Sequence, residues 1–220
     1  MNQSILSLLV LAGIAIFLIL RLRNVLGTRD GFEKPRVDAP DQAATSARRS
    51  FEVIEGGVDH DIADNVTEGS RAADELAKMK RVEPSFSVTE FLNGARGAYE
   101  MILMAFENDD LDSIRDFLAD DVYDAFDSVV QQRRENGLTV HAQFYGVREI
   151  QIIDAEFDEA TQEGEIKLRF VAEIVSAVAN EAGEIVEGDA TEIKRQKDIW
   201  SFARKMGQND PNWRLVATGA

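Results

Sequence analysis

The hydrophobic period of the chain changes from helical to twofold after Gly137, and this change constrains the fold more than any other feature. Before it, apolar residues recur every three or four positions in segments starting near residues 86, 110 and 120, which predicts three helices. After it, apolar and polar residues alternate, which predicts long half-buried strands. The order predicts an α+β fold, in which helices pack on one face of a curved antiparallel sheet of about four strands.

The first of these helices has a clear start. Ser87 and Glu90 have the spacing of a capping box, and Phe86 and Phe91 occupy the positions of a hydrophobic staple around it. We therefore expect the folded domain to begin near Phe86 and to extend over residues 86–220.

Two pairs of aspartates lie at the starts of the other two predicted helices. They are Asp109 with Asp110, and Asp120 with Asp121. Paired carboxylates can perform acid/base chemistry or bind a cation. They also act as helix caps and as partners of the helix dipole. We favour capping, because it accounts for both pairs.

The strand predictions rest on alternation. In the second strand, Ile166, Leu168 and Phe170 share one face. In the strand before it, the apolar parity changes between Ile152 and Ile153, which indicates a bulge that curves the strand. A third strand is predicted from about residue 190 to residue 205, and a fourth from residue 213 to residue 216.

The first twenty residues carry no charge and are mostly apolar, which predicts a membrane anchor over residues 1–24. A cleaved signal peptide is the alternative, but it would have a positive start and small residues at a cleavage site, which are absent here. Arg21, Arg23 and Arg29 follow the apolar run. Because positive charge stays on the cytoplasmic side, a single-pass anchor with its N-terminus outside and its domain in the cytoplasm is expected.

Residues 25–85 are predicted to form an acidic, largely disordered linker, because apolar residues are sparse and show no sustained period. One segment, "TEGSRAADELAKMKRV", has acidic residues early and basic residues late, which favours a helix. Its apolar face is thin, so we expect it to fold only against a partner or not at all.

Composition excludes several kinds of function. The net charge of -16 disfavours nucleic-acid binding, and the absence of cysteine excludes disulfides and thiolate chemistry. His60 and His141 have no second ligand at metal-binding spacing. Asp154 and Asp198 are conceivable general bases in a pocket, but no catalytic set accompanies them. No cofactor, metal site or enzymatic activity is therefore expected.

Residues 85–220 resemble the C-terminal domain of the Tim44 family, the mitochondrial inner-membrane import-motor tethers and their bacterial relatives. The resemblance lies in a W-x-F-x-R strand followed by a short loop and N-W-x-L. The motif residues are Trp200, Phe202, Arg204, Pro211, Asn212, Trp213 and Leu215. The two tryptophans are expected to pack in the core, with lining of a pocket as the alternative.

The resemblance implies a cone-shaped fold like that of nuclear transport factor two, with a large hydrophobic pocket. It also implies an adaptor on the inner face of a membrane, since mitochondrial members recruit the seventy-kilodalton heat-shock chaperone and a related member belongs to the mitochondrial large ribosomal subunit. The uncharged start is like that of bacterial relatives. The family is associated with cardiolipin, whereas residues 86–220 hold 27 acidic and 13 basic side chains.

Together these observations predict a membrane-anchored adaptor on the cytoplasmic face of the bacterial inner membrane. Its partners would be a chaperone, a translocase or a ribosome, and it would serve protein transport or quality control. The alternative is a pocket that binds a lipid or a small apolar ligand, with lyase- or isomerase-like activity.

Overall fold

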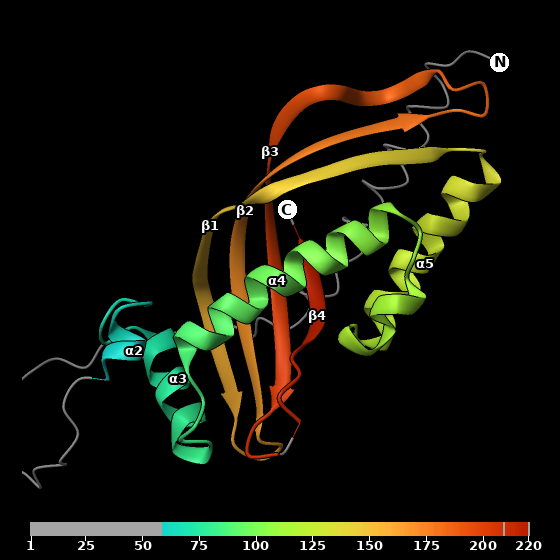
Figure 1. Ribbon diagram of the computed structural model, residues 1–220. Helices are drawn as coiled ribbons and strands as arrows, with labels where there is room; N and C mark the ends of the chain where they lie inside the picture. The colour runs from blue at the N-terminus through green and yellow to red at the C-terminus, as the bar shows by residue number, and fades with distance from the viewer. Residues whose placement is uncertain (1–58, 209, 220) are drawn as a thin grey trace, which may run out of the picture. The chain divides into compact units, whose positions relative to one another are not determined.

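The computed structural model describes residues 59–208 and 210–219, which belong to one compact unit (Figure 1). The predicted anchor with Arg21, Arg23 and Arg29, and the linker as far as residue 58, lie outside this range. Within it, no helix is long and apolar enough to cross a membrane.

The helices are α2 (His60–Ala63), α3 (Arg71–Val82), α4 (Val88–Glu107), η1 (Asp112–Phe117) and α5 (Asp120–Glu135). The strands are β1 (Thr139–Asp158), β2 (Glu163–Ala179), β3 (Ile185–Lys205) and β4 (Arg214–Gly219).

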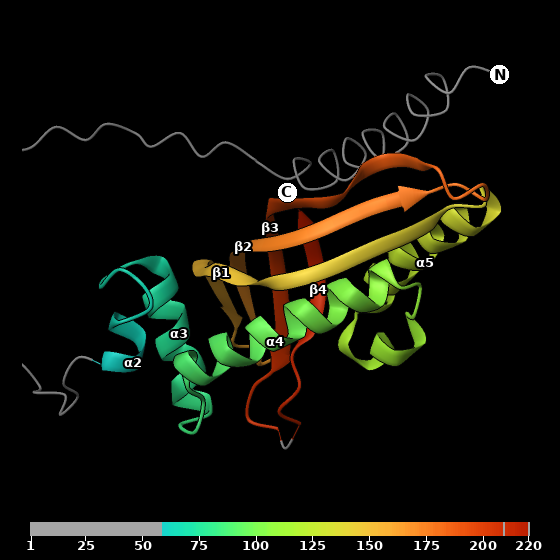
Figure 2. The ribbon, with the colours of Figure 1, turned by 45° about the horizontal axis from the view of Figure 1, so that its top comes forward.

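The four strands form one antiparallel sheet in the order β1-β2-β3-β4, as the alternation predicts. A register shift between Ile152 and Asp154 confirms the predicted bulge in β1. The third strand begins at Ile185, five residues before the predicted position near residue 190, because the alternation is interrupted by a further shift opposite Ile174 and Ser176. The sheet bends strongly at these irregularities (Figure 2).

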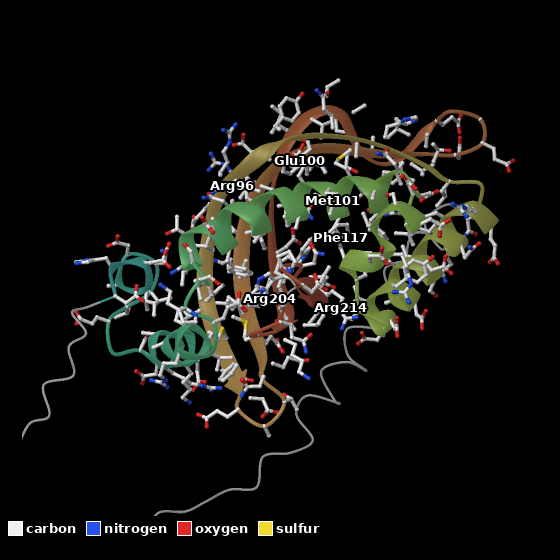
Figure 3. All side chains as sticks on the ribbon, turned by 60° about the horizontal axis from the view of Figure 1, so that its bottom comes forward. Arg96, Glu100, Met101, Phe117, Arg204 and Arg214 are labelled. Atoms are coloured by element: carbon white, nitrogen blue, oxygen red, sulfur yellow. The ribbon has the colours of Figure 1, made fainter. Side chains whose placement is uncertain are left out.

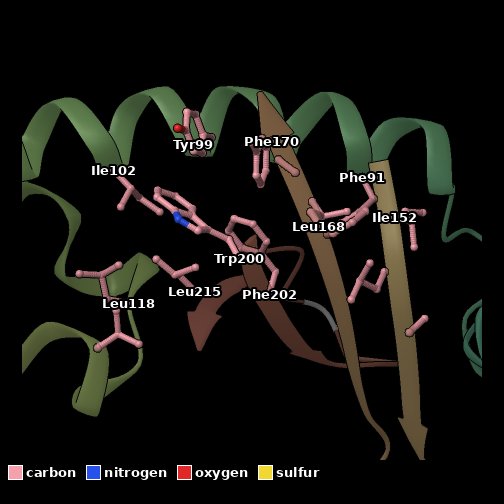
Figure 4. Close-up of a cluster of buried hydrophobic side chains, with 14 of the residues drawn as sticks. Phe91, Tyr99, Ile102, Leu118, Ile152, Leu168, Phe170, Trp200, Phe202 and Leu215 are labelled. Carbon is pink, nitrogen blue, oxygen red and sulfur yellow. The ribbon is translucent and has the colours of Figure 1, made fainter. Parts of the chain in front are cut away.

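The core lies between the concave face of the sheet and α4 (Figure 4). Ile166, Leu168 and Phe170 of β2 are completely buried, which confirms the predicted face of that strand. Tyr99 of α4 stacks on Phe170, with a distance of 4.4 Å between ring centroids, and it also contacts Trp200 at 4.6 Å. The α+β architecture is therefore confirmed, and its centre is filled by packed side chains.

The start of α4 follows its sequence signature. The hydroxyl of Ser87 accepts a hydrogen bond from the Glu90 amide at 3.2 Å. The rings of Phe86 and Phe91 lie 6.3 Å apart, edge to face, so the staple forms.

The capping prediction for the aspartate pairs is wrong. The segment after Asp110 is a short 3₁₀ helix, and neither its N-cap, Leu111, nor that of α5, Ala119, makes a side-chain cap. Asp120 lies in the first turn of α5 and forms an ion pair with Arg115. The charge of Asp120 still complements the dipole of α5. Its carboxylate, however, pairs with Arg115 of the preceding 3₁₀ helix instead of accepting from backbone amides.

Residues 59–85 form structure, which corrects the prediction of a linker up to residue 85. Leu76 and Met79 of α3 are completely buried against the domain. Met79 packs so closely on β2 that a Cβ added to Gly164 would lie 3.0 Å from its sulfur. The segment therefore folds by packing against the domain of its own chain. The apolar face of α3 is thin, but its two buried residues are enough to hold the helix because the sheet supplies the rest of the core around them.

Asp61 of α2 joins the N-terminal helices to α4. Its carboxylate accepts hydrogen bonds from the amides of Val88 at 2.7 Å and Thr89 at 2.9 Å, and it forms an ion pair with Lys80 at 2.7 Å. Burial on its own raises the pKa of Asp61, but the bonds from Lys80 and Thr89 outweigh it and hold the pKa well below its ordinary value. Asp61 is therefore a second cap for α4, supplied from another helix.

Replacing this cap is expected to weaken the domain in a pH-dependent way. Asp61→Asn should lower the free energy of unfolding at pH 7 by about 1–2 kcal/mol, because a charge-assisted cap is lost. Since the folded-state pKa is depressed, the stabilisation is complete above the ordinary value of 3.8 and is lost as the pH falls through the folded-state pKa. Urea unfolding at pH 7 and near pH 3, followed by tryptophan fluorescence, measures the difference. The exposed Glu68→Gln is the matched control, and an equal loss in both variants would contradict the cap.

Candidate functional site

A groove with a volume of about 390 Å³ lies between the first half of α4 and the end of β3. A volume of this size suits a small ligand or a few side chains of a partner. Figure 3 views the domain from the side on which Phe117 and Arg204 of the lining are seen. The full lining consists of Glu83, Ser85, Phe86, Ser87, Glu90, Phe91, Gly94, Ala95, Ala98, Phe117, Phe202, Arg204, Pro211, Asn212 and Trp213.

Aromatic rings form one wall of the groove. The indole of Trp213 lies 4.6 Å from the ring of Phe91 and 5.8 Å from that of Phe86. Phe91 in turn contacts Phe202 at 6.4 Å. Gly94 of α4 also lines the groove. A Cβ added to Gly94 would meet no atom of the described residues within 4 Å, so the space beside this turn of the helix is open. The groove therefore presents an apolar surface next to open space.

Arg204 lines the groove beside Trp213. Its guanidinium donates to Glu83 at 2.7 Å and to the carbonyl of Asp210 at 3.2 Å, and it lies over the Trp213 ring at 5.2 Å. Its side chain is only 7% exposed, so the pair with Glu83 is shielded from solvent. Glu83 also accepts from the Gly207 amide at 2.9 Å. One carboxylate thus holds the end of α3, the end of β3 and the following loop together.

Comparison with known proteins identifies the family. The family model described as a Tim44-like domain matches residues 72–220. The chain belongs to the Tim44 family. The match begins inside α3, in agreement with the burial of that helix.

Two curated relatives show the extent of the similarity. Over 149 residues the chain is 27% identical to the human mitochondrial import inner membrane translocase subunit TIM44 and 25% identical to the mouse protein of the same name. The matched region covers 66% of this chain and 32% of each relative, so about a third of the length of those relatives is represented. The intermembrane space region of the chloroplast protein ARC6 is 8% identical, with a TM-score of 0.37, over 65% of this chain and 93% of that structure. At this level the ARC6 likeness says nothing about fold or function.

The structure divides the residues of the Tim44 motif between groove and core. Five of them line the groove, namely Phe202, Arg204, Pro211, Asn212 and Trp213. Trp200 and Leu215 are 5% and 0% exposed and belong to the core. The two tryptophans therefore differ in role: Trp200 packs under α4, as favoured from the sequence, whereas Trp213 is half-buried in the groove wall.

Ten of the fifteen lining residues were not assigned to a site from the sequence, and Glu83, Phe86 and Phe91 are the ones that form its ion pair and aromatic wall. Phe86 and Phe91 were identified only as a helix staple, and Glu83 fell in the predicted linker. No local pattern could have identified Glu83, because its partner Arg204 lies 121 positions away. The staple was the available signal, since two phenylalanines around a helix start form an apolar surface that another element can extend.

The two aspartates considered as general bases from the sequence, Asp154 and Asp198, lie outside the groove. Asp198 accepts hydrogen bonds from the Tyr99 hydroxyl at 2.5 Å and from Gln196 at 2.8 Å, outside the groove. Burial, and then the bond to Asp198, raises the pKa of Tyr99 well above its ordinary value. Asp154 accepts from the Ala155 amide and lines a separate hollow beside α2. In residues 59–208 and 210–219, no three acidic or histidine side chains are arranged to hold a metal ion.

Proposed function

We propose that this protein is a membrane-anchored adaptor on the cytoplasmic face of the bacterial inner membrane, with a Tim44-like domain that recruits a chaperone, a translocase or a ribosome. The family match carries the proposal, because the curated relatives are subunits of an inner-membrane translocase. The uncharged apolar start and the arginines that follow it support the anchor and its orientation. The groove supports a binding role, since it combines an aromatic wall with a shielded ion pair.

Site-directed cross-linking in native membranes tests the adaptor. The chain has no cysteine, so a single introduced cysteine carries the cross-linker at one known position. Asn212→Cys places it on the exposed rim of the groove, and Ser128→Cys places it on the exposed face of α5 as a matched control. We expect mass spectrometry to find a chaperone, translocase or ribosomal protein enriched at position 212 over position 128. Absence of all three classes from both positions would contradict the proposal.

A ligand-binding role is the second candidate, favoured by the volume of the groove and its aromatic wall. Organic extraction of the purified protein, followed by mass spectrometry, distinguishes the two. A stoichiometric apolar compound that is lost in Trp213→Ala would favour a ligand pocket. An empty groove, together with cross-links at position 212, would favour the adaptor.

A further inference from the structure

One stretch of the outer edge of β1 is left open by the helices beside it. β1 is an edge strand of the sheet, and α2 and α3 lie next to it (Figure 1). At one end, Glu75 of α3 accepts a hydrogen bond from the Phe157 amide at 3.1 Å. At the other end, Arg96 of α4 donates to the Val147 carbonyl at 2.7 Å. Backbone groups of β1 therefore point away from β2 at both ends, where side chains of the helices bind them.

Between these two ends the edge of β1 is free. An edge strand turns the N–H and C=O groups of alternate residues away from its partner strand. In the described part of the chain, the backbone of residues 149–153 makes no hydrogen bond to an element other than β2. Free groups of this kind can pair with an added strand, which is how many domains bind an extended peptide.

A hollow of about 530 Å³ lies beside this free edge. We call it the β1 hollow, and its walls are residues 151–154 of β1 and residues 63–67 and 70–72 of the α2–α3 segment. Ile153, the residue that the bulge adds to β1, is 40% exposed, and Val66 on the other wall is half-buried. The hollow thus combines free backbone groups with apolar side chains, which are the surroundings that a strand requires.

The chain itself supplies a suitable segment just before α2. In residues 30–58, the aromatic and β-branched residues are densest at Phe51, Val53 and Ile54, and such residues favour strands. Gly56 and Gly57 follow this segment. Glycine permits the sharp change of direction that a returning chain needs.

The connection to α2 is long enough for this segment to reach the β1 hollow. Asp59 is the N-cap of α2, and α2 is a single turn that ends at Ala63, a residue of the hollow. The length of that turn is about 6 Å. Residues 55–58 join Ile54 to Asp59, and an extended chain of that length spans about 13 Å. So short a connection gives a local concentration in the millimolar range, which favours this segment over a strand from another molecule.

From these observations we infer that residues 51–54 dock in the β1 hollow as an added strand on the edge of β1. Hydrogen bonds to the free backbone groups hold the segment, and its alternate side chains cover Ile153 and Val66. The docked strand protects β1 from pairing with other chains, which is the aggregation hazard of an exposed edge. It also shortens the free tether to the proposed anchor, which then ends at residue 50. The docking itself requires neither the anchor nor a partner protein.

Hydrogen exchange of the full-length protein, followed by mass spectrometry, tests the docking. After correction for intrinsic rates, the amides of residues 51–54 should exchange at least about tenfold more slowly than those of residues 40–45, because paired amides exchange only when the strand opens. Equal exchange in the two segments would overturn the inference.

A pair of proline variants identifies the partner strand. Val53→Pro with Ile54→Pro removes two successive amides, one of which faces β1 in any register, so exchange in residues 149–153 should accelerate about tenfold. Ala43→Pro with Ala44→Pro makes the same change outside the segment and should leave that exchange unaltered. Equal exchange of residues 149–153 in the two variants would contradict docking on β1.

Disulfide trapping then shows whether the segment docks within its own chain. The chain has no cysteine, so Ile153→Cys can be combined in turn with Glu52→Cys, Val53→Cys or Ile54→Cys. Facing residues of neighbouring strands have Cα atoms about 4.5–5.5 Å apart, within the range of a disulfide. We expect at least one pair to form a disulfide within one chain. Combination of the same cysteines with Tyr145→Cys, exposed on β1 outside the hollow, should form none. Disulfides only between two chains, or none with Ile153→Cys, would overturn the inference.

Discussion

Phe170→Ala is expected to lower the free energy of unfolding by about 3–5 kcal/mol, the usual cost of removing a buried phenylalanine. Phe170 is completely buried at the centre of the sheet, stacked on Tyr99 and 5.9 Å from the ring of Trp200. The variant loses the transfer free energy of the ring and leaves a cavity between α4 and β2. The surrounding aromatic rings are too rigid to close it.

Urea unfolding, followed by tryptophan fluorescence, measures this loss. Both tryptophans of the chain, Trp200 and Trp213, lie in the domain, so the signal reports its unfolding alone. Ile185→Ala is the control, because this side chain is 50% exposed and its loss should change stability by no more than about 0.5 kcal/mol. A loss below about 1 kcal/mol for Phe170→Ala would show that the centre of the domain is loosely packed.

Glu83→Ala is expected to cost about 3 kcal/mol, because it leaves the shielded guanidinium of Arg204 without its carboxylate. The same change removes the acceptor of the Gly207 amide, so the loop after β3 should loosen. Since Arg204 lies over the ring of Trp213, the tryptophan emission of the folded protein should shift to the red. Equilibrium unfolding gives the stability, and the emission spectrum before unfolding reports the loop.

Two controls separate the ion pair from a general loss of charge. Glu100→Gln removes an exposed carboxylate from α4 and should have little effect on stability or emission. The double variant Glu83→Leu with Arg204→Met replaces both charges with apolar groups, and it should cost less than the sum of the two single changes. Strict additivity would mean that Glu83 and Arg204 do not act as a pair.

Local patterns were sufficient for much of the fold. The alternation of Ile166, Leu168 and Phe170 predicts the buried face of β2, and the spacing of Ser87 and Glu90 predicts the start of α4. The parity change after Ile152 predicts the bulge in β1. Each of these features depends on neighbours in the sequence, because strand and helix periods place every second, third or fourth residue on one face. The family motif near the C-terminus is local for the same reason.

The errors arose where contacts outside the local pattern decide the structure, one with a distant part of the chain and one with a neighbouring side chain. Leu76 and Met79 are too few to predict a stable helix, yet the sheet supplies the rest of their core. Asp120 has the position of a cap, yet a nearby arginine takes its carboxylate.

By itself, the sequence determined the α+β class, the start of α4, the buried face of β2, the membership of the Tim44 family and the expectation of an N-terminal anchor. Only the tertiary structure decided that α3 belongs to the domain, that Glu83 meets Arg204, and that Trp213 lines a groove while Trp200 packs in the core. It also left a stretch of the β1 edge open beside the α2–α3 segment. The physical reason is that periodicity encodes which way a side chain points, whereas chain topology sets which distant side chains it meets.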